Sequence, residues 1–554
     1  MGDRSLRVRA KLAALVAGVL ATGFAFGSRP ADAATGWAPT ATAAERLVGA
    51  TDLGAEPAST PLHVAVALNV RNVSALRDLI RRGEVVTPAQ FLAQYAPTAA
   101  QAQSVASYLA NQGFTNVNVA HNRMLVSADG TVGRATSAFK TAVECYRQNG
   151  RVVYANRTVA SVPTALAGSV GAVVGLNDAG VMRVHPAVAT DPPTSCEVSG
   201  VGVPCVYAPQ GFWRAYDATN APTGAATSVA IFAEGNLTGV VQDLRTEETA
   251  TGLPQVPLTV VRTGPASTDT SGADEWDLDT QFSTGMARTV AHLYVYDAPA
   301  LDDASLTEEF NQFAAQDVAK AASASFGECE FQASLDGSML ADDNAFMEAA
   351  AQGQTVFASA GDTGGFCPVG VAANGVPAGA PDVNYPASSP WVVGVGGTTL
   401  VTKADGSYDA ELAWLAGGGG PSLFESQPPF QNGIAPPVGT VCGALTTPCG
   451  RTVPDVAMDA DPNSGANVYV GGQPEGVGGT SLSSPLALGV WARFESARSN
   501  AVGYANPVFY AHNGTSAFHD VTLGDTGPYP ATPGYDLATG LGTFDVAAFI
   551  RAAG

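Results

Sequence analysis

The residues best suited to chemistry in this chain of 554 residues begin with Ser481, which lies in Gly476-Val-Gly-Gly-Thr-Ser-Leu-Ser-Ser-Pro485. Glycines let the backbone approach a bound partner closely, and Pro485 suits the first turn of a helix. We therefore expect Ser481 exposed at a helix N-terminus, where spare N–H groups and the helix dipole favour negative charge on an attacked carbonyl oxygen. The segment thus offers a serine nucleophile. A plain Gly/Ser loop that caps a buried helix is the alternative.

A serine nucleophile needs a neighbouring base, which is usually histidine. The C-terminal two thirds of the chain hold only three histidines, none in a His-Gly-Thr setting: His292, His512 and His519. Carboxylates are the other candidates. Glu275 and Asp279 are four residues apart, so in a helix they share one face and one can orient or share a proton with the other. Asp274 is the nearest competitor, but it lies five residues from Asp279 and fits that face less well.

A third acid, Asp362, lies among glycines in Phe357-Ala-Ser-Ala-Gly-Asp-Thr-Gly-Gly365. It follows a short apolar run, as a loop residue at the end of a strand does. Three acids and a serine therefore form a candidate active site in which carboxyl groups take the place of histidine.

The elements that must position these residues form an alternating pattern after about residue 205. Short apolar runs separated by helical patterns indicate a parallel sheet in an α/β domain, with functional residues at the carboxyl edge of the strands. The runs are Val229–Phe232, Leu258–Val261, Leu293–Tyr296, Ala321–Ser325, Val356–Ser359 and Trp391–Val395.

A first unit, from about Leu62 to Val184, has an α+β pattern. Val64–Leu68 is typical of a strand, and Ser74–Arg82 of a helix that Gly83 ends. A second helix is predicted to start at Thr98, with a capping box. The stretch from Ala187 breaks the pattern with Pro and Gly, which predicts a linker and a processing site; a loop inside one domain is the alternative.

The N-terminal residues resemble a secretory signal. Four basic residues precede the apolar run Leu12–Phe26, and Ala31-Asp-Ala33 fits an A-x-A cleavage site. Three glycines interrupt this short run, and no later stretch reaches the roughly 18 apolar residues of a membrane span. We expect an exported protein that does not span the membrane.

At this point the motifs around Ser481, Glu275 and Asp362 carry a resemblance. Together, in this order and spacing, they are similar to the three motifs of the sedolisin family of serine-carboxyl peptidases, which includes kumamolisin. Gly478 stands where that family often has serine. Further matching segments are Ser323-Ala-Ser-Phe-Gly-Glu-Cys-Glu330, Asn384-Tyr-Pro-Ala-Ser-Ser-Pro390, Val395-Gly-Gly-Thr398, Gly417–Gly420, Pro428-Pro-Phe-Gln431 and Pro454-Asp-Val456.

The resemblance implies a subtilisin-like parallel sheet flanked by helices and preceded by a small α+β activation prodomain. We expect a signal peptide at 1–33, the prodomain at 34–190 and the peptidase domain at 191–554. The prodomain would act as an intramolecular inhibitor. Ser481 would attack the peptide carbonyl, Glu275 would take its proton, and Asp279 would position Glu275. Asp362, kept protonated by a raised pKa, would donate a hydrogen bond to the oxyanion.

Two segments near the C-terminus, Phe518–Gly524 and Thr532–Asp536, bracket a Gly/Pro loop. From chemistry alone they suit either a plain polar turn or a hard cation. Their likeness to the family's Phe-His-Asp and Gly-Tyr-Asp segments implies one calcium ion. Its ligands would be the side chains of Asp520 and Asp536 and the carbonyls of Val521, Thr532 and Gly534. Thr532 stands where the family often has glycine.

Seven cysteines in an exported chain invite disulfide pairing. Cys145 lies in the first unit, and the six that follow allow 15 pairings, among which sequence alone does not choose. Closeness in sequence favours Cys196 with Cys205 and Cys442 with Cys449, and a bridge between Cys329 and Cys367 would join two loops of the cleft.

Composition fits work in an acidic medium. Asp plus Glu number 49 against 27 Lys plus Arg, for a net charge of −22. Such a surface repels nucleic acid and anionic membranes at neutral pH; simple solubility would explain it equally. We expect a monomer whose partners are its peptide or protein substrate and its own prodomain.

The sequence therefore predicts a secreted, acid-active endopeptidase made as a self-processing proenzyme. A tripeptidyl-peptidase of the same family and a catalytically inactive secreted binding homologue are the alternatives. An esterase is disfavoured because Ser481 lacks a Gly-x-Ser-x-Gly elbow and a well-placed histidine.

Overall fold

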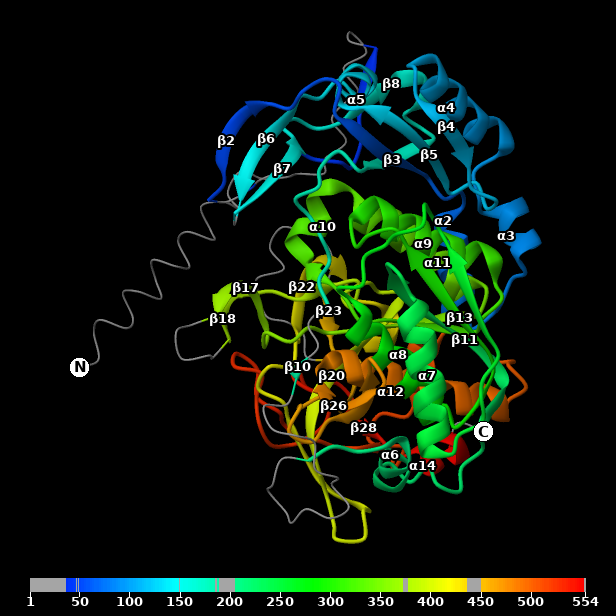
Figure 1. Ribbon diagram of the computed structural model, residues 1–554. Coiled ribbons are helices and arrows are strands. Elements are labelled where there is room, and N and C mark those ends of the chain that lie inside the picture. The colour runs from blue at the N-terminus through cyan, green and yellow to red at the C-terminus, as the bar shows by residue number, and fades with distance from the viewer. Residues whose placement is uncertain are drawn as a thin grey trace, which may run out of the picture.

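The computed structural model describes residues 36–45, 47, 49–148, 150–184, 187–188, 205–371, 377–435 and 450–552. The predicted signal peptide and most of the predicted linker lie outside these residues. An N-terminal unit, residues 36–184, lies above a larger C-terminal unit, residues 205–552 (Figure 1). Among the described residues, no helix is both long and apolar enough to cross a membrane.

The N-terminal unit is built on a four-stranded antiparallel sheet with its own core. The strands, in sheet order, are β4 (Thr115–Val119), β5 (Leu125–Thr131), β3 (Pro61–Leu68) and β9 (Val170–Val174). Two helices, α4 (Ala99–Asn111) and α5 (Val132–Phe139), pack against it. Strand β3 is buried on both faces: Val64 and Val66 belong to the core of this unit, whereas Ala65 and Ala67 pack in a second cluster with Ala304 of the C-terminal unit. The α+β prediction for this unit is confirmed.

Smaller elements complete this unit. They are the sheet of β2 (Thr51–Ala55), β6 (Val143–Gln148) and β7 (Arg151–Asn156), the pair β1 (Trp37–Pro39) and β8 (Ser161–Pro163), and helices α2 (Val73–Arg81) and α3 (Pro88–Gln94). Helix α2 lies within one residue of its prediction. Helix α4 begins after Thr98, whose side chain accepts from the Gln101 N–H at 3.2 Å while the Gln101 side chain accepts from the Thr98 N–H at 2.9 Å. The predicted capping box is therefore present.

The C-terminal unit contains the predicted parallel sheet. In sheet order its strands are β12 (Leu258–Arg262), β13 (Val290–Ala298), β11 (Gly224–Glu234), β14 (Ala321–Ala324), β16 (Thr355–Ser359) and β20 (Val392–Thr402). Strand β20 also pairs in parallel with β24 (Val456–Asp459) and antiparallel with β21 (Tyr408–Ala413). Each of the six apolar runs falls in one of these strands. The central strands β14 and β16 are buried along their whole length because helices cover both faces of the sheet, whereas β12 at the edge is largely accessible.

The helices form two layers. Helices α9 (Asp303–Gln316) and α11 (Ser338–Ala351) pack together on the side of the sheet nearer the N-terminal unit, and α7 (Thr238–Thr251), α8 (Ala273–Ala287) and α12 (Thr480–Ala497) lie on the other side (Figure 1). Helix α12 contacts β11, β14, β16, β20 and β24, so it runs beneath the middle of the sheet.

Helices α8 and α12 approach each other closely at Gly489. A Cβ atom at Gly489 would lie 2.7 Å from the carbonyl oxygen of Ser283 in α8, so any larger residue would separate the two helices. Around this point Leu486 and Trp491 are fully buried, and each such side chain contributes roughly 1.5–3 kcal/mol of transfer free energy. This packing fixes the spacing between the helices that carry Glu275 and Ser481.

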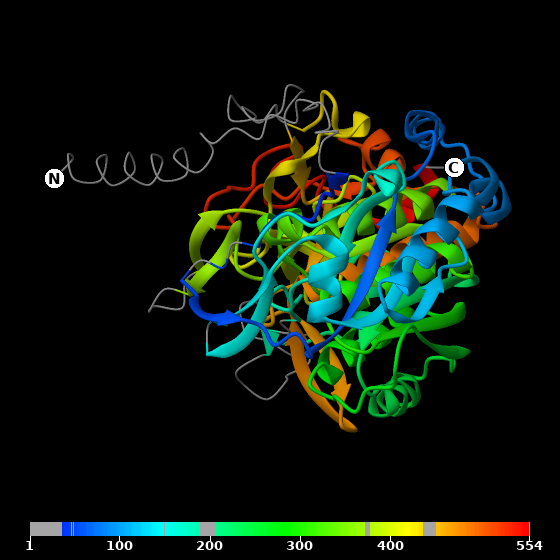
Figure 2. The same ribbon diagram turned by 90° about the horizontal axis from the view of Figure 1, so that it is seen from above.

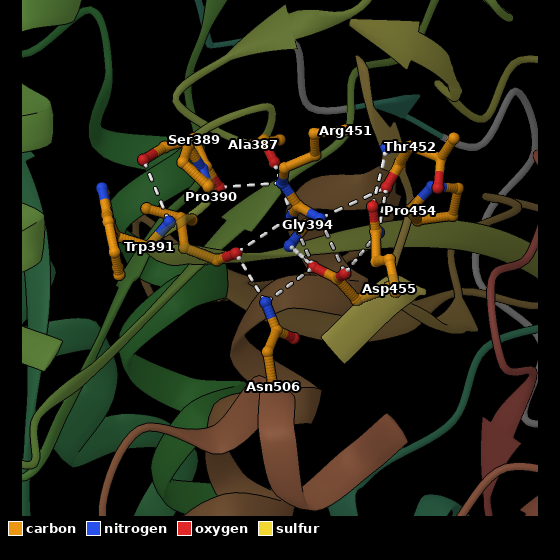
Figure 3. Close-up of polar contacts among 12 residues, drawn as sticks. Ala387, Ser389, Pro390, Trp391, Gly394, Arg451, Thr452, Pro454, Asp455 and Asn506 are labelled. Carbon is orange, nitrogen blue, oxygen red and sulfur yellow. Dashed lines mark hydrogen bonds and ion pairs between the residues drawn. The ribbon is translucent and has the colours of Figure 1, made fainter. Parts of the chain in front are cut away.

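A buried ion pair anchors the edge of the sheet (Figure 3). The Arg451 guanidinium donates to both oxygens of Asp455, at 2.8 and 2.6 Å, and both side chains have no exposed surface. Asp455 also accepts from the backbone N–H of Gly394 in β20 at 2.8 Å and from Asn506 at 3.2 Å. Because these donors satisfy both carboxylate oxygens, the pair holds β20 beside the segment that leads into β24.

The remaining described elements of the C-terminal unit are short. They are α6 (Pro209–Ala215), α10 (Glu330–Asp336), α13 (Ala505–Ala511), α14 (Val546–Ala552), β10 (Ala187–Val188), β15 (Glu328–Cys329), β17 (Phe366–Val371), β18 (Pro377–Pro381), β19 (Asn384–Tyr385), β22 (Gly420–Ser426), β23 (Gly450–Val453), β25 (Ala466–Val470), β26 (Gln473–Gly478), β27 (Phe518–His519) and β28 (Thr543–Phe544).

The N-terminal unit lies across the C-terminal unit, mainly over α9 and α11 (Figure 2). Several polar contacts join them at this surface. His63 of β3 approaches Glu308 of α9 at 3.2 Å, and Asn122 donates to Glu348 of α11 at 2.7 Å. Glu308 and Asp129 raise the His63 pKa to about 9 despite partial burial.

The structure describes the side chains of three of the seven cysteines. Cys145 in the N-terminal unit is free, and Cys205 and Cys329 are disulfide-bonded. The side chains of Cys196 and Cys367 lie outside the described part of the chain, as do those of Cys442 and Cys449. The proposed pairings therefore stay predictions.

Candidate active site

Helix α8 presents Glu275 and Asp279 on one face, as their spacing predicts. Both residues have no exposed surface, whereas the neighbouring Asp274 is exposed. Ser481 is close enough to Glu275 to lower its pKa, although their geometry falls short of a regular hydrogen bond. The close packing of α8 and α12 thus brings the predicted base and the predicted nucleophile together.

Ser481 is the second residue of α12, and its surroundings differ from the expectation in two respects. It is 3% exposed rather than open to solvent. Pro485 is the sixth residue of the helix, in its second turn, so it does not donate to the carbonyl of Ser481 four residues earlier. The Ser325 hydroxyl lies 3.3 Å from that carbonyl oxygen and shares its one proton between it and Asp279 Oδ1, which is closer at 2.6 Å. The proline therefore leaves an acceptor that ties the nucleophile to the loop after β14.

Ser325 also joins the nucleophile to the carboxyl pair. Its hydroxyl donates to Asp279 Oδ1 at 2.6 Å, and the Ser481 hydroxyl is 3.4 Å from the Ser325 carbonyl oxygen. Sequence reasoning placed Ser325 at the carboxyl edge of the sheet but gave it no role. Its contacts come from segments about 46 and 156 residues away, and no local pattern reveals them.

The pKa values of Glu275 and Asp279 are both raised. Burial is the main cause for each, and for Glu275 the neighbouring Asp279 raises the pKa further. Ser325 lowers the pKa of Asp279 in part by donating to it. Two close carboxyl groups in such a site resist double ionisation, so the pair favours a state with one shared proton.

Asp362 follows β16 and reaches the start of α12. Its Oδ1 atom accepts from the backbone N–H of Thr480 at 2.8 Å and from the Thr480 hydroxyl at 2.7 Å. Although the residue as a whole is only half-buried, its Oδ2 atom is completely buried and has no hydrogen-bond partner among the described residues. Asp362 is thus fixed through one oxygen, and the other is left for a further contact. Thr480 is a second residue that sequence reasoning did not single out.

Burial raises the pKa of Asp362 to about 6, and the two hydrogen bonds from Thr480 hold it from rising further. Gly361 permits this loop: its φ is +104°, and a Cβ there would meet the Asn384 amide nitrogen at 1.9 Å. Below about pH 6 the Asp362 carboxyl is therefore protonated and able to donate a hydrogen bond.

The three histidines in the C-terminal two thirds of the chain make other contacts. His292 lies 2.8 Å from the Thr259 hydroxyl, His512 contacts the Val508 carbonyl, and His519 stacks on Tyr408. The groups around Ser481 in the described structure are carboxyl and hydroxyl groups.

Two described parts of the segment after β9 pair with elements next to this site. Met182 donates to the Leu301 carbonyl at 3.0 Å, and Arg183 pairs antiparallel with Gly327, two residues after Ser325. Farther along, strand β10 pairs antiparallel with β26, which places Ala187 opposite Gly478, three residues before Ser481. The chain leaves the N-terminal unit past α10 and reaches β10 (Figure 1). It therefore pairs with the C-terminal unit on both sides of the nucleophile.

The two C-terminal segments predicted to bind calcium lie side by side. Asp520 accepts from the Gly534 N–H at 3.1 and 3.0 Å, and Asp536 accepts from the Thr532 N–H at 2.7 Å. Asp536 also accepts from the N–H groups of residues 538 and 539. The Asp520 carboxylate thus links the two segments through the backbone of Gly534, and the calcium ligands stay a prediction.

Three comparisons bear on this arrangement. Residues 48–179 match the family model described as the pro-kumamolisin activation domain. The chain is 37% identical to sedolisin of Pseudomonas sp. (strain 101) over 96% of this chain and 94% of that protein, and 35% identical to xanthomonalisin of Xanthomonas sp. (strain T-22) over 91% of this chain and 67% of that protein. A solved structure of Pseudomonas sedolisin, complexed with two molecules of pseudo-iodotyrostatin, superposes with a TM-score of 0.57 at 38% identity, over 63% of this chain and 98% of that one.

Proposed function

Because the chain belongs to the sedolisin family of serine-carboxyl peptidases, we propose that it is a secreted, acid-active endopeptidase made as a self-processing proenzyme. In this proposal residues 1–33 are the signal peptide, 34–190 the activation prodomain and 191–554 the peptidase domain. The basic residues, apolar run and A-x-A site at the N-terminus support export.

In the proposed reaction Ser481 Oγ attacks the peptide carbonyl while Glu275 accepts its proton. Glu275 then passes this proton to the leaving amine, and a water molecule releases the acyl group by the reverse sequence. Asp279 keeps Glu275 oriented and shares the proton of the pair. The Ser325 hydrogen bond to Asp279 supports this role, because it holds that carboxyl group in place.

Asp362 is proposed to stabilise the oxyanion. Negative charge develops on the carbonyl oxygen as Ser481 attacks, and a donor fixed beforehand stabilises that charge without reorganising. The buried Oδ2 atom of Asp362 lacks a partner and would carry the donated proton. With a pKa of about 6, Asp362 holds this proton only in acid, which is the physical reason for acid activity.

The path of the chain on both sides of Ser481 carries the endopeptidase proposal. A tripeptidyl-peptidase needs a groove that ends three residues before the scissile bond. Here residues 181–183 pair with Asp302 and Gly327 of the C-terminal unit, and residues 187–188 pair with β26, the strand that leads to Ser481. Such a groove accommodates a continuous chain, which suits cleavage within a polypeptide. The same path supports self-processing of the precursor in the segment that follows Val184.

We also propose one calcium ion at the C-terminal segments. Asp520 and Asp536 would bind it through their carboxylates, and Val521, Thr532 and Gly534 through their carbonyls. Asp520 already contacts Gly534 across the 14 residues that separate them. The ion would supply the charge that holds these two segments together.

Acidifying the purified precursor tests this function. The wild-type protein should shorten itself, with a new N-terminus between Val184 and Ala208, and N-terminal sequencing identifies the cut. The Ser481→Ala precursor should remain intact under the same conditions. If it shortens at the wild-type rate, Ser481 is not the nucleophile.

A further inference from the structure

A second group of buried carboxylates lies where the two units meet, and the proposed reaction does not use it. Asp303 is the first residue of α9, Glu328 lies in β15, and Asp336 ends α10. One oxygen from each lies within 4.8 Å of the other two, and the three residues are 2–5% exposed. We call these three residues the Asp303 cluster.

Most oxygens of the Asp303 cluster have no donor. Both oxygens of Asp303 and both of Glu328 are buried without a hydrogen-bond partner among the described residues. Asp336 is held through its Oδ1 atom by the N–H and hydroxyl of Ser338 at 2.8 and 2.7 Å, and its carboxyl group also interacts with the side chains of Asn177 and Asp303. None of the three forms an ion pair with a described Lys, Arg or His. Carboxylates buried in this way cost several kcal/mol each unless a cation or a proton compensates them.

The unpartnered oxygens point to one place. A Cβ atom at Gly180 would lie 2.7 Å from Asp303 Oδ2 and 3.5 Å from both Glu328 Oε2 and Asp336 Oδ2. Three carboxylate oxygens from three separate elements therefore converge beneath the backbone of Gly180. A glycine is needed there because any side chain would enter the space between them.

From this convergence we propose that the Asp303 cluster binds a divalent calcium ion. Carboxylate oxygens are hard ligands, and calcium binds them at 2.3–2.6 Å, so ligands on opposite sides of the ion lie up to about 5 Å apart. The separations of at most 4.8 Å in the cluster are compatible with this span. Calcium tolerates irregular coordination by six to eight oxygens, whereas magnesium demands near-ideal octahedral geometry.

The position of the cluster indicates what the ion would do. Asp303 follows Asp302, which pairs with Val181, and Glu328 follows Gly327, which pairs with Arg183. The ion would thus join the segments around Asp302 and Gly327, which pair with the chain as it leaves the N-terminal unit. Gly180 covers the site, and Asn177 lowers the pKa of Asp336 through a side-chain hydrogen bond. Calcium bound here would hold α9, β15 and α10 in the arrangement against which residues 177–183 of the precursor pack.

Counting bound calcium in the full-length Ser481→Ala precursor tests the proposal without relying on catalysis. Equilibrium dialysis at neutral pH should give two ions per chain, one in this cluster and one at the C-terminal segments. Asp520→Asn should remove the C-terminal ion and leave one. That remaining ion is measured with the Asp303 cluster intact, so its absence would overturn the proposal whatever becomes of cluster variants.

Adding Glu328→Gln to the Asp520→Asn precursor should then remove the last ion. Glu330→Gln is the matched control: Glu330 is also buried and lies two residues away, but Ser422 and the Leu423 N–H already satisfy it. This control should retain the ion. If Glu328→Gln does not fold, Asp303→Asn serves in its place. An ion that survives either substitution in a folded protein would show that the cluster holds shared protons rather than calcium.

Discussion

The catalytic cluster that we propose, formed by Glu275, Asp279 and Asp362, and the Asp303 cluster each contain three carboxyl groups with buried oxygen atoms, yet their partners differ. Hydroxyl groups of Ser481, Ser325 and Thr480 face the catalytic cluster. In the Asp303 cluster both oxygens of Glu328 are buried without a hydrogen-bond partner among the described residues, and Asp303 faces the carboxyl group of Asp336 rather than a hydroxyl group.

This difference separates two uses of buried acids. A hydroxyl donates one hydrogen bond and leaves the other oxygen of the carboxyl group available to gain or lose a proton, which suits acid–base chemistry. Oxygens that converge on one point without donors suit a cation. Burial raises the pKa of the carboxyl groups in both clusters, so burial alone does not distinguish them.

The largest effect is expected from the nucleophile. Ser481→Ala should lower kcat/KM for peptide cleavage on the order of 10⁵-fold, because the covalent step is lost. Ser483→Ala is the matched control, since this hydroxyl lies on the same helix but donates to the carbonyls of Met458 and Asp459. Each protein would first be cut at the linker by an added protease, which chromatography then removes. Similar losses in both variants would contradict the assignment.

Glu275→Gln should have the second largest effect. We expect kcat to fall on the order of 10⁴-fold, because the amide does not accept the serine proton. Asp277→Asn offers a stringent control. Asp277 lies on the same helix, is 1% exposed, and burial raises its pKa to about 8. If an unusual pKa alone marked a catalytic acid, both variants would fail; we expect only Glu275→Gln to do so.

Asp362→Asn should reduce kcat on the order of 10²- to 10³-fold and change the pH profile. The wild-type enzyme needs Asp362 protonated, so its kcat/KM should fall as the pH rises through about 6. On the acid side kcat/KM should fall once the Glu275 and Asp279 pair holds a second proton. Asparagine keeps an N–H donor and does not titrate. The kcat/KM of the Asp362→Asn enzyme should therefore fall less steeply on the alkaline side of the optimum.

Measuring kcat/KM across pH for both proteins decides this point. An alkaline limb of unchanged steepness in Asp362→Asn would remove Asp362 from the oxyanion site. A wild-type optimum at neutral or alkaline pH would contradict the carboxyl mechanism itself.

The smallest effect concerns the proposed C-terminal calcium. Asp520→Asn should lower the melting temperature by a few degrees in saturating calcium, since an ion at 100 times its Kd contributes about 2.7 kcal/mol. Asp520 is a better probe than Asp536, because Asp520 accepts from one backbone N–H, that of Gly534, whereas Asp536 accepts from three, and its substitution would destabilise the loop more in any case. A chelator should lower the melting temperature of the Asp520→Asn protein less than that of the wild type.

Much of the catalytic site followed from local pattern. The four-residue spacing of Glu275 and Asp279 places them on one helix face wherever that helix packs, and the apolar runs imply a parallel sheet with Asp362 at its carboxyl edge. The start of α12 was predicted less well, because a proline is also tolerated in the second turn when another donor takes the freed carbonyl. Here that donor is Ser325.

Tertiary structure alone decided the contacts between distant segments. Ser325 and Thr480 acquire their partners only when the loops after β14 and β16 meet the start of α12. The spacing of Asp303, Glu328 and Asp336 in the sequence does not signal a site. Their oxygens converge only because the start of α9, strand β15 and the end of α10 meet beneath Gly180. Sequence periodicity determines which side chains lie on the same face of one helix or strand. Contacts between separate elements depend on how the whole chain packs.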